Sequence, residues 1–223
     1  MIVAVFGASG RTGRAFVQVA AEAGLLQRLH YRTAPTEPSA DTATVVVGAL
    51  NDPTAVREVL RGADAAVVLF GPRPSAPNVF CAAATKSIIA GMRTQQVPRL
   101  LCLTGAMIGE LPGNVSLGLK LISFGLRRTS QAETMDDRDN QERLVRNSKL
   151  MWVAVKPPRL TDGVGGVVDA GPSVQVGLLS HCSRIALSRF LVDELLQPKY
   201  ANTPVYVRED GRRETGDGRR PAD

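Results

Sequence analysis

The sequence is poor in the residues that most often bind metals or form disulfide bridges. Three cysteines and two histidines occur among 223 residues, and no two cysteines have C-x-x-C spacing. Since Cys81, Cys102 and Cys182 are far apart in the chain, we expect neither a metal nor a disulfide framework. Aromatic residues make up only 4% of the chain, so aliphatic side chains must fill most of the core.

Long apolar runs are also missing. A membrane span needs about 18 consecutive apolar residues, and no segment comes close to that length. No basic segment precedes an apolar run, as one would in a signal peptide. We therefore expect a cytoplasmic protein with no membrane partner. The serine hydrolase pattern G-x-S-x-G is absent as well, which argues against Ser-His-Asp hydrolysis.

Acidic residues are outnumbered, and the net charge is +6 with an isoelectric point near 9.6. Such an excess can indicate nucleic acid or an anionic small molecule. Basic residues are scattered among acids and no DNA-recognition module is visible, so we expect a small-molecule partner and no nucleic acid. We predict a monomer or a small homo-oligomer.

Apolar runs alternate with helical patterns along the chain, which is typical of βαβ units and a parallel sheet. The length suits one domain over residues 1–207. Residues 208–223, rich in Gly, Arg and Asp, have little to bury and are predicted to be disordered. The predicted fold is α/β, a Rossmann-type doubly wound and mostly parallel sheet of six to seven strands with helices on both faces.

The apolar patterns predict the following elements. Strands are expected at residues 1–6, 27–32, 43–48, 65–70, 99–104, 150–155 and 203–207, with a small hairpin over 167–176. Helices are expected at residues 11–23, 53–62, about 75–96, 133–147 and 183–196. Asp52 with Pro53, and Ser183, mark two helix starts. Residues 105–130, rich in Gly, Leu and Ser, fit an apolar lid, an interface or an amphipathic core helix.

A glycine-rich loop stands between the first strand and the first helix. Glycine allows the tight turn and lets backbone N–H groups approach a pyrophosphate, while the helix start presents further donors to it. In this strand–loop–helix context the pattern G-x-x-G-x-x-G predicts a dinucleotide site. Its residues are Gly7, Ala8, Ser9, Gly10, Arg11, Thr12 and Gly13.

The end of the second strand distinguishes between the two nicotinamide cofactors. NAD-binding sites place an acidic residue about 20 residues beyond the loop to bind the ribose 2′-hydroxyl. No acidic residue occurs between Glu22 and Glu37, and Arg32 stands where a guanidinium would meet a 2′-phosphate. We therefore predict NADP (NADPH) and regard NAD as the weaker alternative. Arg11 could add a second contact.

The chain resembles the atypical short-chain dehydrogenases/reductases called NmrA-like or NAD(P)-binding Rossmann proteins, with the biliverdin-IXβ/flavin reductases as the nearest enzymes in layout. The resemblance rests on the glycine loop, on residues 46–53 (VVGALNDP) and on residues 155–159 (VKPPR). It implies contacts to the cofactor from the ends of successive strands. These residues are Ala49, Leu50, Leu69, Phe70, Gly71, Thr104, Gly105, Pro157 and Pro158.

The Tyr-x-x-x-Lys pair that usually serves these reductases is missing from the sequence. Four residues after Tyr31, Tyr200 and Tyr206 come proline, proline and aspartate. A flavin, quinone or tetrapyrrole can accept hydride and take its proton from solvent, whereas an isolated ketone needs an acid. We therefore favour a conjugated acceptor, with Thr104 and Arg159 as the candidate catalytic residues.

Three functions remain open at this stage. The first is an NADPH-dependent reductase of a conjugated or aromatic small molecule. The second is a non-catalytic redox sensor that binds NADP(H) and a protein partner, which the missing tyrosine would suit. The third is an NADP-retaining isomerase, lyase or cyclase.

Overall fold

The computed structural model describes residues 1–36, 42–72 and 79–209. Its strands are β1 (Ile2–Phe6), β2 (Leu26–Tyr31), β3 (Ala43–Val47), β4 (Ala65–Val68), β5 (Arg99–Leu103), β6 (Met151–Lys156), β7 (Arg159–Thr161), β8 (Val168–Gly171), β9 (His181–Ser183) and β10 (Thr203–Glu209). Its helices are α1 (Arg11–Glu22), α2 (Pro53–Leu60), α3 (Cys81–Thr94), α4 (Leu117–Leu126), α5 (Ala132–Arg146) and α6 (Arg184–Leu196).

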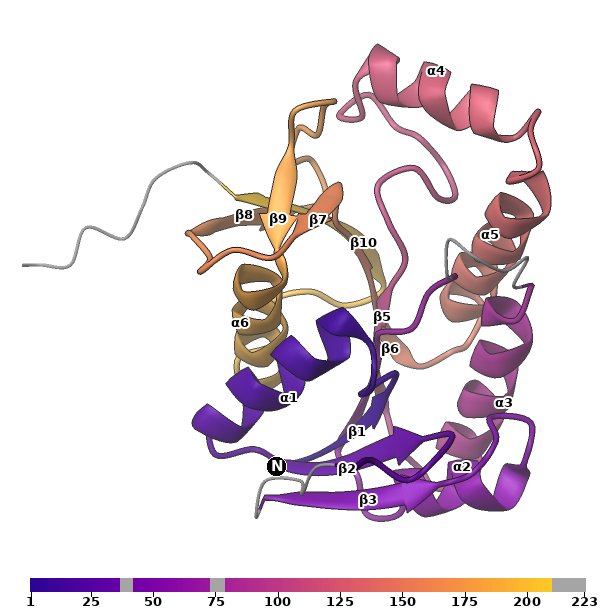
Figure 1. Ribbon diagram of the computed structural model, residues 1–223, viewed down its shortest axis with the longest axis vertical. Coiled ribbons are helices and arrows are strands. Elements are labelled where there is room, and N and C mark those ends of the chain that lie inside the picture. The colour runs from indigo at the N-terminus through magenta and orange to yellow at the C-terminus, as the bar shows by residue number, and fades with distance from the viewer. Residues whose placement is uncertain (37–41, 73–78, 210–223) are drawn as a thin grey trace, which may run out of the picture.

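One eight-stranded sheet runs through the molecule in the order β3-β2-β1-β4-β5-β6-β10-β8 (Figure 1). All neighbouring strands are parallel except β8, which pairs antiparallel with β10. The chain moves outward in one direction from β1 to β3 and returns to the other side of β1 at β4. This topological switch point is where open α/β sheets bind ligands, beside the carboxyl ends of the strands.

Helices cover both faces of the sheet (Figure 1). On one face α1 and α6 pack on Val3 and Val5 of β1, and on the other α2, α3 and α5 pack on Ala4 and Phe6. Because both faces are buried, the central strands are apolar throughout rather than alternating. The predicted doubly wound Rossmann-type fold is confirmed.

Two helix starts form as the sequence predicts. The Asp52 carboxylate accepts a hydrogen bond from the Thr54 N–H at 2.8 Å, with Pro53 in the first turn of α2. The Ser183 hydroxyl accepts from the Ala186 N–H at 3.1 Å and caps α6. In both cases a short polar side chain satisfies an amide that the helix leaves without a partner.

Four sequence expectations about the elements differ from the structure. The sheet has eight strands rather than six to seven, because β8 joins its edge. Residues 167–176 do not form a hairpin: β8 pairs with β10, and Val176 bridges to Val115 instead. Helix α3 begins at Cys81, later than the predicted start near residue 75, and residues 75–78 of the expected helix lie outside the described residues. Strand β10 continues to Glu209, two residues beyond the predicted end of the domain.

The segment 105–130, for which three roles remained open, contains α4 at the periphery of the molecule (Figure 1). Only Leu119 and Ser123 of this helix are buried, so it is not a core helix. Across the described ranges, none of the helices has the length and apolarity needed to cross a membrane.

Candidate functional site

The glycine loop lies at the switch point and packs against Leu69 and Phe70, which directly follow β4. Gly7 has a φ of +96°, and a Cβ there would lie 2.7 Å from the Phe70 N atom. A Cβ on Gly13 would lie 2.0 Å from the Gly7 carbonyl oxygen, so α1 can approach β1 only because this residue is glycine. Gly10 has more room, with 3.3 Å to the same oxygen. The loop therefore has the tight turn and close helix–strand packing of a dinucleotide-binding loop.

The N-terminus of α1 opens from this loop without a side-chain cap. Its N-cap residue, Gly10, offers no side chain, and the first turn contains no acidic residue. The first amides of the helix and the positive end of its dipole are therefore available to an anion. Ser9, Gly10 and Arg11 are exposed here, while Ala8 and Thr12 are buried. This cradle fits a pyrophosphate, because its amides have no side-chain cap and no acidic residue in the first turn of α1 would repel an anion.

The other residues predicted to contact the cofactor follow the carboxyl ends of β2 to β6. Since these strands are parallel neighbours, their ends meet along one edge of the sheet. Hydrogen bonds tie the ends together: Thr104 N–H donates to the Val155 carbonyl and Ala106 N–H to the Pro157 carbonyl, each at 2.9 Å. The structure thus brings to one edge Arg32, Ala49, Leu50, Leu69, Phe70, Gly71, Thr104, Gly105, Pro157 and Pro158.

Arg32 directly follows β2, with its side chain exposed and in no ion pair with any residue of the described ranges. The neighbouring His30 is buried, and its Nε2 lies 2.9 Å from the carbonyl oxygen of Gly48, at the end of β3. Burial lowers the pKa of His30, and Arg32 adds to that effect. A neutral His30 thus joins the ends of β2 and β3, beside the exposed cation Arg32.

Arg11 of the glycine loop makes a contact that the sequence did not predict. Its guanidinium pairs with Asp162, which directly follows β7. The other oxygen of the same carboxylate accepts from Arg184, the first residue of α6, at 2.6 Å. Arg184 is mostly buried, whereas Arg11 and Asp162 are both more than half exposed. One carboxylate therefore pairs with two arginines beside the predicted pyrophosphate cradle, and the three side chains together carry a net positive charge.

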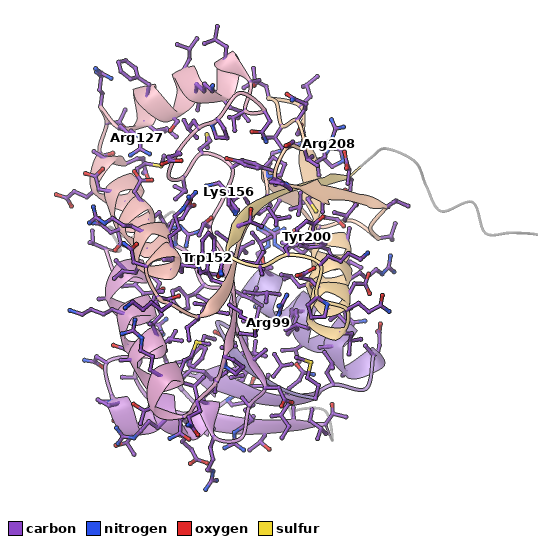
Figure 2. All side chains as sticks on the ribbon, turned by 180° about the vertical axis from the view of Figure 1, so that it is seen from behind. Arg99, Arg127, Trp152, Lys156, Tyr200 and Arg208 are labelled. Atoms are coloured by element: carbon purple, nitrogen blue, oxygen red, sulfur yellow. The ribbon has the colours of Figure 1, made fainter. Side chains whose placement is uncertain are left out.

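A buried charged cluster lies beneath the ends of β5 and β6. Glu142 of α5 and Lys156 of β6 are 1% and 0% exposed, and Lys156 Nζ donates to Glu142 Oε2 at 2.6 Å. The Thr104 hydroxyl donates to the same oxygen at 3.1 Å, and Arg146 donates to Oε1 at 2.9 Å. Lys156 lies in the interior of the molecule (Figure 2). Burial lowers its pKa, while Glu142 acts in the opposite direction.

This cluster decides how Thr104 can act. A hydroxyl has one hydrogen, and that of Thr104 points to the Glu142 carboxylate. Thr104 can therefore accept a hydrogen bond from a ligand hydroxyl but cannot donate one while this contact lasts. The arrangement suits a binding role better than a proton-donating role.

Arg138 of α5 is a second buried residue that the sequence did not single out. Its guanidinium donates to the Phe70 carbonyl at 3.3 Å, to the Leu103 carbonyl at 3.1 Å and to the Thr104 carbonyl. It therefore holds the ends of β4 and β5 together at the candidate site. The sequence did contain a signal for this polar face. Arg138, Glu142 and Arg146 are spaced four residues apart, so on a helix they share one side, and on a helix that covers a sheet that side can face inward.

Among the tyrosines, only Tyr206 lies near a buried lysine. Lys156 Nζ is 5.6 Å from the centre of its ring, and the Tyr206 hydroxyl donates to the Glu110 carbonyl at 3.4 Å. Burial raises the pKa of Tyr206 well above its usual value. This pair therefore lacks the lowered tyrosine pKa on which the usual Tyr-x-x-x-Lys chemistry depends.

Arg159, the second candidate catalytic residue, begins β7 and is exposed. Its strand pairs with β9, where Arg159 lies opposite His181.

The described residues contain no cluster of His, Cys, Asp and Glu that could hold a metal ion. All three cysteines are buried, and burial raises the pKa of Cys81 to about 11 and of Cys102 to about 12, so they are poor nucleophiles at neutral pH.

Comparison with known proteins agrees with this geometry. A family described as NAD(P)H-binding matches residues 7–198 of the chain, from the glycine loop to just beyond α6. The chain belongs to the NAD(P)H-binding family. The match covers most of the eight-stranded sheet and every candidate site residue named above.

Solved structures share the fold of this NAD(P)H-binding protein. An NADP complex of a short-chain dehydrogenase/reductase from Veillonella parvula has a TM-score of 0.74 at 17% identity, covering 94% of this chain and 95% of that one. The anaerobillin reductase ChuY from Escherichia coli O157:H7 has a TM-score of 0.74 at 15% identity over 100% of both chains. A Rossmann-fold NAD(P)-binding protein from Shigella flexneri has a TM-score of 0.70 at 19% identity, covering 100% and 98%.

Proposed function

We propose that this protein is an NADPH-dependent reductase that transfers hydride to a conjugated or aromatic small molecule such as a flavin, a quinone or a tetrapyrrole-like compound. The observation that carries the proposal is the uncapped α1 N-terminus behind a loop whose Gly7 and Gly13 have no room for a Cβ, at the switch point of an NAD(P)H-binding fold. The resemblance of the fold to that of an anaerobillin reductase supports the reductase assignment.

Bound NADPH would supply the hydride, so the protein's residues have to bind and orient. The glycine loop and the α1 amides would hold the pyrophosphate, and Arg32 the 2′-phosphate. Thr104, fixed by Glu142, would accept a hydrogen bond from a ribose hydroxyl. Arg159 would hold an anionic acceptor or stabilise a developing oxyanion, since a guanidinium stays protonated at any working pH. A conjugated acceptor needs no protein acid, which agrees with the hydrogen-bonding of Thr104 and the raised pKa of Tyr206.

Arg32 gives a direct test of cofactor choice. We expect Arg32→Gln to weaken NADPH binding by about 10- to 100-fold, because a charged hydrogen bond to the 2′-phosphate is lost. NADH affinity should stay within about twofold, since NADH lacks that phosphate. Calorimetric titration of both cofactors measures this, and Arg57→Gln, an exposed arginine on α2, is the control. Equal losses for NADPH and NADH would show that Arg32 does not read the 2′-phosphate.

Asp162 competes with the cofactor for Arg11 if Arg11 contacts a phosphate. We expect Asp162→Asn to strengthen NADPH binding by about threefold, a small effect because the pair is largely exposed. The gain should shrink at high salt, which screens the charges. Asp169→Asn removes another exposed acid paired with an arginine, Arg208, and should leave the affinity unchanged. Weaker binding in Asp162→Asn would mean that Asp162 positions the arginines instead of competing for them.

The decisive experiment is a calorimetric titration with NADPH and NADH, followed by an absorbance assay of NADPH oxidation with flavin and quinone acceptors. Tight NADPH binding with turnover is the expected result. Tight binding without turnover would favour a redox sensor or an isomerase, lyase or cyclase that retains NADP. No binding of either cofactor would contradict the assignment of the glycine loop and Arg32.

A further inference from the structure

Helix α4 exposes large apolar side chains on its outer side. Leu117, Leu121 and Phe124 follow one another at helical spacing, and they are 71%, 61% and 57% exposed. Ile122 is 45% exposed beside them. The inner side of the helix, with buried Leu119, is also apolar. A helix that is apolar on both sides is normally covered on both sides, so the outer side of α4 is a candidate contact surface.

The loop before β9 extends this surface. Leu178 and Leu179 are 56% and 92% exposed, and a Cβ on Gly118 of α4 would lie 2.8 Å from Leu178. Figure 1 shows this loop reaching towards α4 at the outer end of the molecule. We call this surface the α4 apolar face. It consists of Leu117, Leu121, Ile122, Phe124, Leu178 and Leu179.

The charged residues of α4 and of the segments directly before and after it have one sign. Residues 111–132 contain Lys120, Arg127 and Arg128 and no acidic residue. Arg127 lies below α4 in Figure 2, and it pairs with two acidic residues of α5, Asp139 at 2.5 Å and Asp136 at 3.6 Å. Within the described part of the chain, Lys120 and Arg128 take part in no ion pair. The Arg128 guanidinium stacks 3.3 Å from the centre of the Phe124 ring, so a cation lies directly beside the exposed apolar side chains.

This combination distinguishes between possible occupants. A second copy of the chain in a two-fold contact would place the same cations, Lys120 and Arg128, on both sides of the interface, and like charges repel. An anionic lipid surface accepts apolar side chains and attracts the flanking cations at the same time. We propose that the α4 apolar face docks on an anionic lipid surface, with α4 lying in the plane of the headgroups. The proposal does not depend on the reductase assignment, and it departs from the sequence expectation of no membrane partner.

Vesicle sedimentation of the full chain tests the proposal. We expect binding to phosphatidylcholine vesicles that contain roughly one third phosphatidylglycerol, and little binding to phosphatidylcholine alone. The double variant Leu121→Ser and Phe124→Ser should bind more than about tenfold more weakly, because the inserting side chains are removed. Leu196→Ser, at an exposed leucine at the end of α6, is the matched control and should bind like the parent protein.

The cations are tested separately. The double variant Lys120→Gln and Arg128→Gln should weaken binding to anionic vesicles by about 30-fold, whereas Arg57→Gln with Lys86→Gln removes two exposed charges elsewhere and should have little effect. Phe124→Trp provides a readout of insertion. Its fluorescence should shift to the blue and be quenched by brominated lipid, above the background of the buried Trp152.

Two results would overturn the proposal. One is absence of binding, or binding that the α4 variants leave unchanged. The other is a stable dimer in solution that Leu121→Ser with Phe124→Ser converts to a monomer, which would assign the face to a second copy of the chain. Circular dichroism and thermal melts of each variant establish that a loss of binding is not a loss of folding.

Discussion

Replacing Glu142 with glutamine is expected to lower the free energy of unfolding at neutral pH by about 3–5 kcal/mol. The substitution leaves Lys156, which is 0% exposed, without the carboxylate that accepts its hydrogen bond. Arg146 loses its partner at the same time. A buried charge with no counter-charge retains its full desolvation penalty, which makes this one of the two largest effects we predict. Denaturant unfolding measures it, and the melting temperature should fall by roughly 10 °C.

The loss should depend on pH in a specific direction. Burial lowers the pKa of Lys156 in the folded protein below the ordinary value of 10.5 that applies to the unfolded chain. At pH values between the folded pKa and 10.5, the unfolded chain therefore binds more protons than the folded chain. The free energy of unfolding therefore rises with pH in that window. Glu142 opposes the effect of burial, so its removal lowers the pKa of Lys156 further and widens the window downward. We expect Glu142→Gln to regain stability as the pH rises towards about 10.

Two further variants separate burial from charge in this prediction. Glu58, like Glu142, pairs with two cations, here Arg28 and Arg61, but it is 41% exposed, so Glu58→Gln should cost no more than about 1 kcal/mol. The double variant Glu142→Leu with Lys156→Met removes both buried charges and should be more stable than Glu142→Gln alone. A cost for Glu142→Gln as small as that for Glu58→Gln would contradict the role we assign to the cluster.

Replacing Gly13 with alanine is expected to abolish measurable NADPH binding, with affinity reduced by more than about 100-fold. The new Cβ would lie 2.0 Å from the Gly7 carbonyl oxygen and 2.8 Å from the Ala8 Cα atom, and both are backbone atoms that no side-chain rotation can move. Helix α1 must then shift away from β1, which displaces its amides from the predicted pyrophosphate position. Calorimetric titration measures the affinity, and a thermal melt reports the strain.

Gly125 of α4 provides the control for this substitution. Apart from its chain neighbours and the backbone of its own helix, no atom lies within 4 Å of a Cβ at Gly125, so Gly125→Ala should bind NADPH normally and gain up to about 1 kcal/mol of helix stability. If Gly13→Ala bound NADPH within twofold of the parent protein, the glycine loop could not be the pyrophosphate site. A folded protein with lost binding is the expected outcome.

The glycine loop and the βαβ alternation were predictable because each depends on residues close together in the chain. A strand, three glycines and a helix start all fall within Ile2–Glu22, and the glycine spacing itself specifies the turn. The caps at Asp52 and Ser183 are likewise local, since each side chain binds an amide two or three residues away. Parallel strands then place the predicted cofactor residues along one edge, because strand direction alone decides where their ends meet.

Other features could not be read from local patterns because their partners are distant. Strand β8 was assigned to a hairpin, yet it pairs with β10 more than 30 residues away. The inward-facing role of Glu142 depends on Lys156 from β6, and the role of Arg138 depends on carbonyl groups of β4 and β5. The salt bridge from Arg11 to Asp162 spans 151 residues. For α4, one apolar sequence fitted a lid, an interface or a core helix, and its position at the edge of the fold resolved which side chains face outward. Short-range hydrogen bonding and periodicity therefore specify the helices and strands and the sheet edge where the predicted cofactor residues lie. Long-range packing decides which charged groups are buried as pairs and which apolar side chains stay exposed.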